Sequence, residues 1–236
     1  MLRNLVDVFK LRIGMLIALT ALGGLLVMPG PSLPVWKTLV LVITVFLSSA
    51  AAGAFNQYSE LDIDRRMART RKRPFVTGAL PHNRYWLLGI GALLLAAVLA
   101  ATLALNWVSA LYIFLGAFTY AVVYTVWLKR RTWLNIVFGG LAGSFAVLAG
   151  AAAVDPALGP LPLILAIVLF LWTPSHFWSL AIALHQDYKS AGVPMLPVVK
   201  GDQAAAWIIL GNTVLLVLAS QAPVLYGLGA VYLAGA

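Results

Sequence analysis

Long apolar stretches are the feature that most constrains this 236-residue chain, because they recur along nearly its whole length. A transmembrane helix needs about 20 apolar residues to cross the hydrocarbon core of a bilayer. Hydrophobic residues make up 62% of the chain and charged residues only 10%, which no soluble domain of this size requires. We therefore predict an all-α, polytopic transmembrane helical bundle with seven complete spans, at 13–29, 38–58, 85–105, 107–128, 133–154, 161–184 and 207–226.

Residues 227–236 resemble the start of an eighth span that is cut short. We expect one transmembrane domain over residues 1–236, with C-terminal helices missing. No segment between the spans is long enough to fold as a separate soluble domain. The chain has no cysteine, which excludes disulfides, thiolate metal sites and cysteine nucleophiles.

Basic residues are distributed unevenly between the two sides that these spans define. With the N-terminus in the cytoplasm, the inside segments carry every lysine and arginine except Lys37. Cytoplasmic loops carry such an excess, so the bias fixes the predicted orientation and explains the net charge of +9 without a nucleic-acid partner. The two long polar loops, 59–84 and 185–206, then both face the cytoplasm. We expect the chemistry there, in a plasma-membrane protein of a bacterium or archaeon.

The first polar loop begins with oxygen-bearing side chains at helical spacing. Asn56, Glu60 and Asp64 recur at i, i+4 and i+8, so a helix that continues through them places all three on one face. Acids at a membrane boundary are costly and usually bind something. These ligands suit Mg²⁺, which bridges carboxylates to substrate phosphates, and the basic run 65–73 suits a diphosphate. For Asp62, off this face, pairing with Arg66 or Arg69 along the helix explains the acid equally well.

The second polar loop carries Asp187 just beyond the end of an apolar helix. Two acidic helix ends that face each other across a bundle would form a two-sided cation site. Lys189 lies beside Asp187 and is a further candidate for binding a substrate. At the inner end of the fourth span, Tyr124 precedes Lys129 and Arg130. An interfacial aromatic residue with flanking cations is the alternative explanation for these three.

His176 lies in an aromatic membrane segment, Trp172 to Trp178, in which we expect Pro174 to break the helix. A lone membrane histidine can simply bond a neighbouring helix. Its aromatic surroundings also suit a flat macrocycle, to which a neutral imidazole can be an iron ligand or a hydrogen-bond partner. The small residues in 139–143 are expected to let helices pack closely.

These segments together resemble a known family. The chain is similar to the UbiA superfamily of intramembrane prenyltransferases and, within it, to the protoheme IX farnesyltransferase (haem O synthase) branch. The matching motifs cover nearly the whole chain in the expected order: Asn56-x3-Glu60-x-Asp62-x-Asp64-x2-Met67-x-Arg69-Thr70-x2-Arg73-Pro74, Tyr124-Thr125-x3-Lys129-Arg130-x-Thr132, Trp172-Thr173-Pro174-x-His176-Phe177-Trp178 and Asp187-Tyr188-x2-Ala191-Gly192-Val193-Pro194-Met195-Leu196-Pro197. The last two distinguish the branch, because relatives that prenylate quinone precursors usually carry paired aspartates in the second motif.

The resemblance implies a bundle of about nine spans. It also implies Mg²⁺-dependent transfer of a farnesyl group from farnesyl diphosphate to a vinyl group of haem B, which gives haem O. By the same resemblance, the residues that hold the metal and diphosphate are Asn56, Glu60, Asp64 and Asp187. The implied substrate-binding residues are Arg69, Arg73, Lys129 and Arg130 at the diphosphate, Tyr124 as a hydrogen-bond donor, and His176 on the haem side. The lipid bilayer and a downstream haem A synthase or terminal oxidase assembly are the candidate partners.

The chain departs from the family pattern in three places. Glu60 stands where an aspartate is usual and lengthens the arm by one methylene, Ala146-Val147 replaces a proline pair, and Ser175 replaces a proline. Other functions therefore stay open. One is a prenyltransferase of the same superfamily that acts on a quinone precursor or another aromatic acceptor. Another is a membrane transporter that couples a cation through these acids, and a third is a damaged homologue that only binds haem.

Overall fold

Helices form the whole architecture of the described chain. The computed structural model describes residues 1–30, 32–229 and 232–233, and this part contains no β-strand. Element η1 is a π-helix that continues α7, and η2 is a 3-10 helix that continues α12. The elements are α1 (Leu2–Val8), α2 (Leu11–Leu26), α3 (Val35–Ser59), α4 (Leu61–Arg66), α5 (Pro74–Thr77), α6 (Tyr85–Ala104), α7 (Trp107–Phe118), η1 (Thr119–Leu128), α8 (Asn135–Val154), α9 (Pro160–Ala183), α10 (His185–Ser190), α11 (Leu196–Lys200), α12 (Asp202–Gln221) and η2 (Ala222–Tyr226).

The predicted spans all coincide with apolar helices. Within the described residues, six are long and apolar enough to cross a membrane: Val35–Ser59, Tyr85–Ala104, Trp107–Leu128, Asn135–Val154, Pro160–Ala183 and Asp202–Tyr226. The first predicted span corresponds to α2, which has 16 residues and is therefore about 24 Å long. The all-α membrane bundle is confirmed. The expected eighth span, at 227–236, lies partly outside the described residues.

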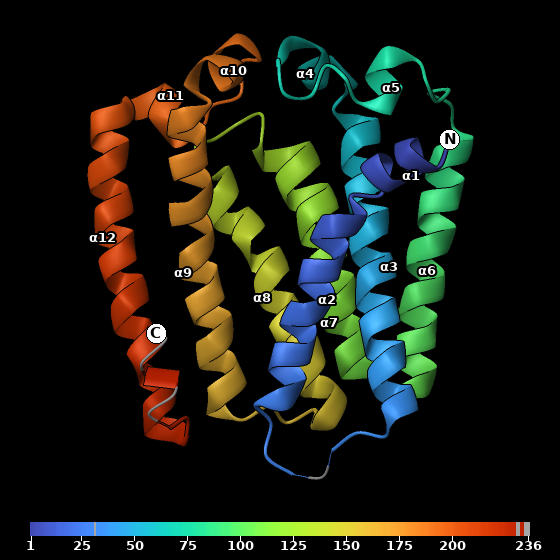
Figure 1. Ribbon diagram of the computed structural model, residues 1–236, viewed down its shortest axis with the longest axis vertical. Helices are drawn as coiled ribbons and strands as arrows, with labels where there is room; N and C mark the ends of the chain where they lie inside the picture. Colours follow the sequence, from blue (N-terminus) through green and yellow to red (C-terminus); the bar gives the residue numbers. More distant parts are fainter. Residues whose placement is uncertain (31, 230–231, 234–236) are drawn as a thin grey trace.

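Helix α8 is the central helix of the bundle. Of its apolar window 61% is buried, against 11% for the window that begins with α12. It packs against α2, α7 and α9, while α6 on α3 and α12 on α9 form the two flanks (Figure 1). Most buried residues of α8 are alanine or glycine. Such small residues let the helix backbones approach closely without a hydrophobic driving force between them.

The contact between α2 and α8 depends on two glycines. A Cβ atom at Gly24 would overlap the backbone carbonyl of Val147, and one at Gly150 would overlap the carbonyl of Ala21. We expect Gly24→Ala to lower the free energy of unfolding by about 1–3 kcal/mol, because a backbone cannot move aside as a side chain can. Gly23→Ala is the matched control, since a Cβ there meets no atom within 4 Å. Equal melting temperatures for the two variants in detergent would contradict this packing.

The predicted packing role of the 139–143 glycines is confirmed. A Cβ atom at Gly139 would lie 2.9 Å from the Tyr124 ring, and one at Gly140 would lie 3.0 Å from Thr173 Cβ. These glycines therefore allow α8 to contact η1 on one side and α9 on the other.

Helix α9 runs without interruption through Pro174, so the expected break is wrong. A proline removes one backbone hydrogen bond, but membrane helices tolerate it where neighbouring helices supply partners. Here Asn212 of α12 donates hydrogen bonds to the Leu171 carbonyl at 2.6 Å and to the Ser175 hydroxyl at 2.7 Å. The Asn212 side chain of α12 thus bonds to the α9 backbone before the proline and to a side-chain hydroxyl just after it.

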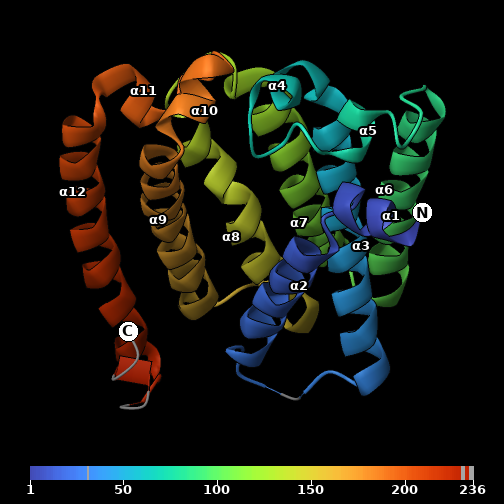
Figure 2. The same cartoon turned by 45° about the horizontal axis from the view of Figure 1, so that its top comes forward.

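The short helices α4, α5, α10 and α11 all lie across one end of the bundle, which we call the loop end (Figures 1 and 2). Both polar loops that the sequence singled out, 59–84 and 185–206, lie there. The opposite end has short connections. At one of them, Asn106 caps α7 by accepting a hydrogen bond from Ser109 N at 2.9 Å and donates to the Ala152 carbonyl at 2.7 Å. The fold therefore gathers the candidate residues at a single end.

Candidate active site

Glu60 separates two helices at the loop end. Helix α3 ends at Ser59 and α4 begins at Leu61, while Glu60 itself has φ −103° and ψ 21°. A helix that continues through Asp64, on which the predicted common face depended, is not present, because the chain turns at Glu60 and α4 lies across the loop end. The spacing still holds locally, since Glu60 N bonds to Asn56 O at 3.1 Å and Asp64 N bonds to Glu60 O at 2.8 Å. Asn56, Glu60 and Asp64, the three residues of the predicted face, are all buried, with 1–2% of their surface exposed.

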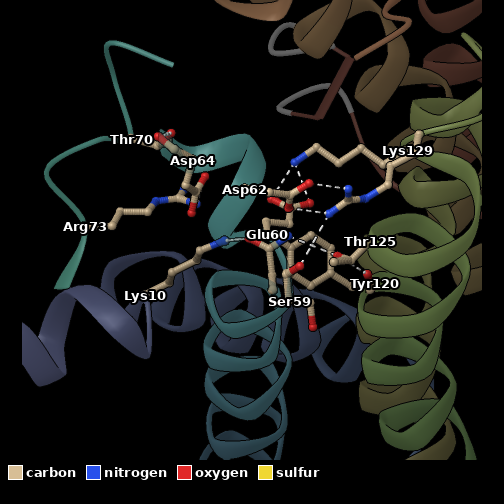
Figure 3. Close-up of polar contacts among 12 residues, drawn as sticks. Lys10, Ser59, Glu60, Asp62, Asp64, Thr70, Arg73, Tyr120, Thr125 and Lys129 are labelled. Carbon is tan, nitrogen blue, oxygen red and sulfur yellow. Dashed lines mark hydrogen bonds and ion pairs between the residues drawn. The ribbon is translucent and has the colours of Figure 1, made fainter. Parts of the chain in front are cut away.

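Each buried carboxylate is bound by one cation (Figure 3). Lys129 Nζ lies 2.6 Å from both oxygens of Glu60. Arg73 Nη1 lies 2.8 and 2.7 Å from the two oxygens of Asp64. A buried charge is costly unless it is paired and hydrogen-bonded. The two cations therefore account for the presence of ionised acids in the interior, and they come from the end of η1 and from the loop after α4.

Asn56 connects these pairs to the N-terminal segment. Lys10 Nζ donates hydrogen bonds to Asn56 Oδ1 at 2.6 Å and to the Tyr120 hydroxyl at 2.9 Å. Asn56 Nδ2 donates to Thr125 Oγ1 at 3.0 Å, which in turn donates to the Tyr120 carbonyl at 2.8 Å. Desolvation, and next the positive charge of Arg73, lowers the pKa of Lys10 to about 7. We call the following residues the polar cluster: Lys10, Asn56, Glu60, Asp64, Arg73, Tyr120, Thr125 and Lys129.

Asp187 joins the second loop to the first. Its carboxylate oxygens accept hydrogen bonds from the backbone N–H groups of Ala68 at 3.1 Å and Arg69 at 3.2 Å. The Thr70 hydroxyl, in the same turn, donates to the Asp64 carbonyl at 3.0 Å. The two acidic loops are thus in direct contact, as the sequence predicted. The Asp64 and Asp187 side chains nevertheless have separate partners, one a guanidinium and the other two backbone amides.

Asp62 and Arg130 form a separate and more exposed ion pair. Two guanidinium nitrogens of Arg130 lie 2.6 and 2.8 Å from the Asp62 oxygens, with side chains 41% and 56% exposed respectively. Hydrogen bonds from Arg130 lower the pKa of Asp62 to about 2. Pairing of Asp62 was predicted, but with the nearby Arg66 or Arg69, whereas the partner comes from beyond η1. A cavity of about 190 Å³ lies beside the pair, between Arg66 and the turn at Gly192.

The remaining predicted site residues lie around the polar cluster or away from it. Tyr124 is half-buried, and Lys129 Nζ lies 5.5 Å from the centre of its ring. Arg69 and Lys189 are exposed at the loop end. His176 is an exposed residue of α9 and stacks on Trp172, with ring centres 4.4 Å apart. The ring contacts of His176 are with its own helix, and the structure does not bring it into the polar cluster.

The chemistry of the donor atoms fits Mg²⁺, although their present partners are cations or amides. Within the described part of the chain, no three acidic or histidine side chains come together as a metal site. Asn56, Glu60, Asp64 and Asp187 nevertheless supply amide and carboxylate oxygens, the hard ligands that Mg²⁺ prefers. Glu60 and Asp64 could bind a metal once Lys129 and Arg73 turned to another anion. The four-residue metal site stays a prediction.

Another surface cavity, of about 450 Å³, lies elsewhere and is mainly apolar. It is formed by Phe9 and by the first turns of α6, including Trp86, Ile90 and Leu93. None of the polar cluster lines it, so its size does not make it the candidate site.

The sequence did not nominate Lys10 or Tyr120, although both belong to the polar cluster. Lys10 precedes the first span, where a basic residue is expected from topology alone. Tyr120 lies in the middle of an apolar window, one turn before Tyr124. The i, i+4 spacing of Tyr120 and Tyr124 is a local pattern, and in the structure their rings stack with centres 5.6 Å apart. The hydrogen bond from Lys10 to Tyr120 depends on the tertiary fold, so no local pattern indicates it.

Comparison with known proteins places this geometry in a family. The model of the UbiA prenyltransferase family matches residues 17–236. Protoheme IX farnesyltransferase 2 of Paramagnetospirillum magneticum is 56% identical over 235 residues, covering 100% of this chain and 82% of the relative. Protoheme IX farnesyltransferase 1 of the same organism is 53% identical over 227 residues, covering 96% and 79%.

A solved structure shares the fold. The UbiA homolog from Archaeoglobus fulgidus bound to DMAPP and Mg²⁺ superposes with a TM-score of 0.83 at 17% identity. The match covers 97% of this chain and 80% of that protein. Because the family model matches nearly the whole chain and close relatives align along its full length, the chain belongs to the UbiA prenyltransferase family.

Proposed function

We propose that this chain transfers a farnesyl group from farnesyl diphosphate to a vinyl group of haem B, which yields haem O. The observation that carries the proposal is the polar cluster, where two buried acids are each paired with a cation at one end of a UbiA-family bundle. The relatives named protoheme IX farnesyltransferase support haem as the acceptor.

The residues that would hold Mg²⁺ are Asn56, Glu60, Asp64 and Asp187. Bound there, the metal would neutralise the diphosphate and hold it at the loop end. Lys129 and Arg73, released from Glu60 and Asp64, would then donate hydrogen bonds to diphosphate oxygens. Charge that develops on the leaving group is stabilised best by such preorganised donors in a site that excludes water.

The reaction needs no nucleophilic side chain, which agrees with a chain that lacks cysteine. The bond between C1 of the farnesyl chain and oxygen breaks, and its electron pair leaves with the diphosphate. The vinyl π electrons of the haem then form a bond to the allylic cation. Water adds to the resulting carbocation and loses a proton, which leaves a hydroxyethylfarnesyl substituent. His176, beside Trp172, is our candidate for a contact with the haem ring.

We further propose that the loop end faces the cytoplasm of a bacterial or archaeal plasma membrane. Every lysine and arginine except Lys37 falls in segments on that side, which is the bias expected for cytoplasmic loops. Arg69, Arg130, Lys189 and Tyr124 would surround the entry of the diphosphate there. A haem A synthase or terminal oxidase assembly is the class of partner that would take up the product.

Mass spectrometry of extracted haem tests the reaction directly. Purified protein is incubated with haem B and farnesyl diphosphate, with Mg²⁺ or with excess EDTA. We expect a haem heavier by one farnesyl group and one hydroxyl group in the first sample and unmodified haem in the second. A quinone precursor offered in place of haem is the acceptor control. Modification of that compound, with haem left unchanged, would assign the chain to another branch of the family.

A further inference from the structure

Lys10 lies at a constrained link between the N-terminal helix and the first span. Helix α1 ends before Lys10, and α2 begins directly after it. The backbone of Lys10 is in the left-handed region, with φ 49° and ψ 44°. Only Lys10 and Leu158 among the described non-glycine residues have positive φ. This conformation is unfavourable for a lysine, and such strain persists where the surrounding structure requires it.

The stem of Lys10 lies across a glycine of α3. A Cβ atom at Gly53 would be 3.3 Å from Lys10 Cβ and Cδ and 3.4 Å from its Cγ. Gly53 is one turn before Asn56, so the stem runs along α3 toward the polar cluster (Figure 3). Gln57, which follows Asn56 in α3, holds the segment before Lys10 by donating a hydrogen bond to the Asp7 carbonyl at 2.6 Å. Contacts with α3 therefore hold both the stem of Lys10 and the backbone that precedes it.

The amine of Lys10 has neutral partners where the other two cations have acids. Its bonds go to Asn56 Oδ1 and the Tyr120 hydroxyl, whereas Lys129 and Arg73 are paired with Glu60 and Asp64. Within the described residues, Lys10 forms no salt bridge, so the polar cluster holds one basic side chain more than it holds acids. A buried basic group without an acid partner is poorly stabilised in its charged form, and an anion that enters the site would complete the pairing.

We propose that Lys10 binds the diphosphate of the substrate and that Asn56 is its resting partner in the ligand-free state. This inference rests on the proposed function and adds to it a residue and a movement. Asn56 Oδ1 cannot serve the ammonium of Lys10 and a metal ion at once. Occupation of that oxygen by the metal therefore releases the amine toward diphosphate oxygens. The N-terminal helix is thereby coupled to the loading of the site.

The absence of cysteine in this chain makes a chemical-rescue experiment specific to Lys10. In Lys10→Cys, alkylation by 2-bromoethylamine forms a carbon–sulfur bond, releases bromide and a proton, and regenerates an amine on an arm as long as that of lysine. Alkylation by 1-bromopropane gives an arm of the same length without the charge. Mass spectrometry verifies each modification. Binding of inorganic pyrophosphate in the presence of Mg²⁺ is then measured by calorimetry in detergent.

We expect the propylated protein to bind pyrophosphate about 10-fold or more weakly than the wild type, since a charge-assisted hydrogen bond contributes about 1.5–3 kcal/mol. The aminoethylated protein should recover to within about threefold. Arg12→Met, which removes an exposed cation two residues away, should leave the affinity unchanged. If Lys10→Cys does not fold, Lys10→Met and Lys10→Arg make the same comparison, because both keep a long stem against Gly53.

The failure of this inference can be told apart from the failure of the proposed function. If the wild type binds pyrophosphate and the propylated protein binds it equally well, Lys10 has no such role and the farnesyl transfer stands. If the wild type neither binds pyrophosphate nor modifies haem, the proposed function is wrong and the inference falls with it.

Discussion

Asp64→Asn is expected to abolish farnesyl transfer while the protein still inserts and folds. Asparagine keeps the shape of the side chain but removes the charge that pairs with Arg73 and that would hold Mg²⁺. The Thr70 hydrogen bond goes to the backbone carbonyl of residue 64 and is kept. Losing one preorganised electrostatic contact typically costs 100-fold to 1000-fold in rate, and we expect a decrease of at least about 100-fold here.

The measurement is the yield of farnesylated haem per unit of purified protein. Membrane insertion and the elution volume in detergent report on folding. Asp155→Asn is the matched control, because Asp155 is an exposed acid beyond the far end of α8 and its carboxylate only caps the following turn at Ala157. Near-normal turnover in Asp64→Asn would refute the metal and diphosphate assignment of the polar cluster.

Lys129→Met is expected to destabilise the protein as well as to inactivate it. Glu60 is 1% exposed and bonds to Lys129 through both oxygens, so the substitution leaves a buried charge without a partner. Removing one member of a buried pair typically costs about 3–5 kcal/mol. The double variant Glu60→Gln, Lys129→Met removes the charge itself and should recover more than half of that loss. It should not recover activity, because neither the acid nor the cation is restored.

Unfolding in detergent measures this prediction, with Arg130→Met as the control. Arg130 is adjacent to Lys129 and also binds an acid bidentately, but the Arg130–Asp62 pair is largely exposed. Exposed pairs contribute about 0–1 kcal/mol, so the loss should be small. Equal losses for Lys129→Met and Arg130→Met would show that burial does not distinguish the two pairs.

Hydropathy predicted the spans well because a bilayer requires a long apolar segment wherever a helix crosses it. The predicted 85–105 and 107–128 are Tyr85–Ala104 and Trp107–Leu128 in the structure. Hydropathy does not indicate how the chain runs where it leaves the membrane. The turn at Glu60 lies in such a place, where tertiary contacts compete with the helix, and the sequence pattern alone does not indicate whether the helix continues there.

The residue types of the site could be predicted, but most of their partners could not. Glu60, Asp64 and Asp187 stood out because acids are expensive at a membrane boundary. Their pairings join segments far apart in the sequence, as with Glu60 and Lys129, so no local pattern indicates them. Lys10 was overlooked for a related reason. A cation before the first span is expected from topology, and only the packing of α1 and α2 on α3 shows that this one enters the site.

The π-helix η1 makes the length of one segment as important as its composition. Its hydrogen bonds skip one more residue than those of an α-helix, as in the bond from Lys129 N to the Tyr124 carbonyl at 2.9 Å. If the rest of the segment kept its present winding, deleting a single residue between Thr119 and Tyr124 would shift Lys129 by one position along the helix and turn its side chain away from Glu60. Apolar substitutions on the lipid side of η1 should leave activity unchanged, whereas deletion of one residue there should lower activity as much as the removal of Lys129.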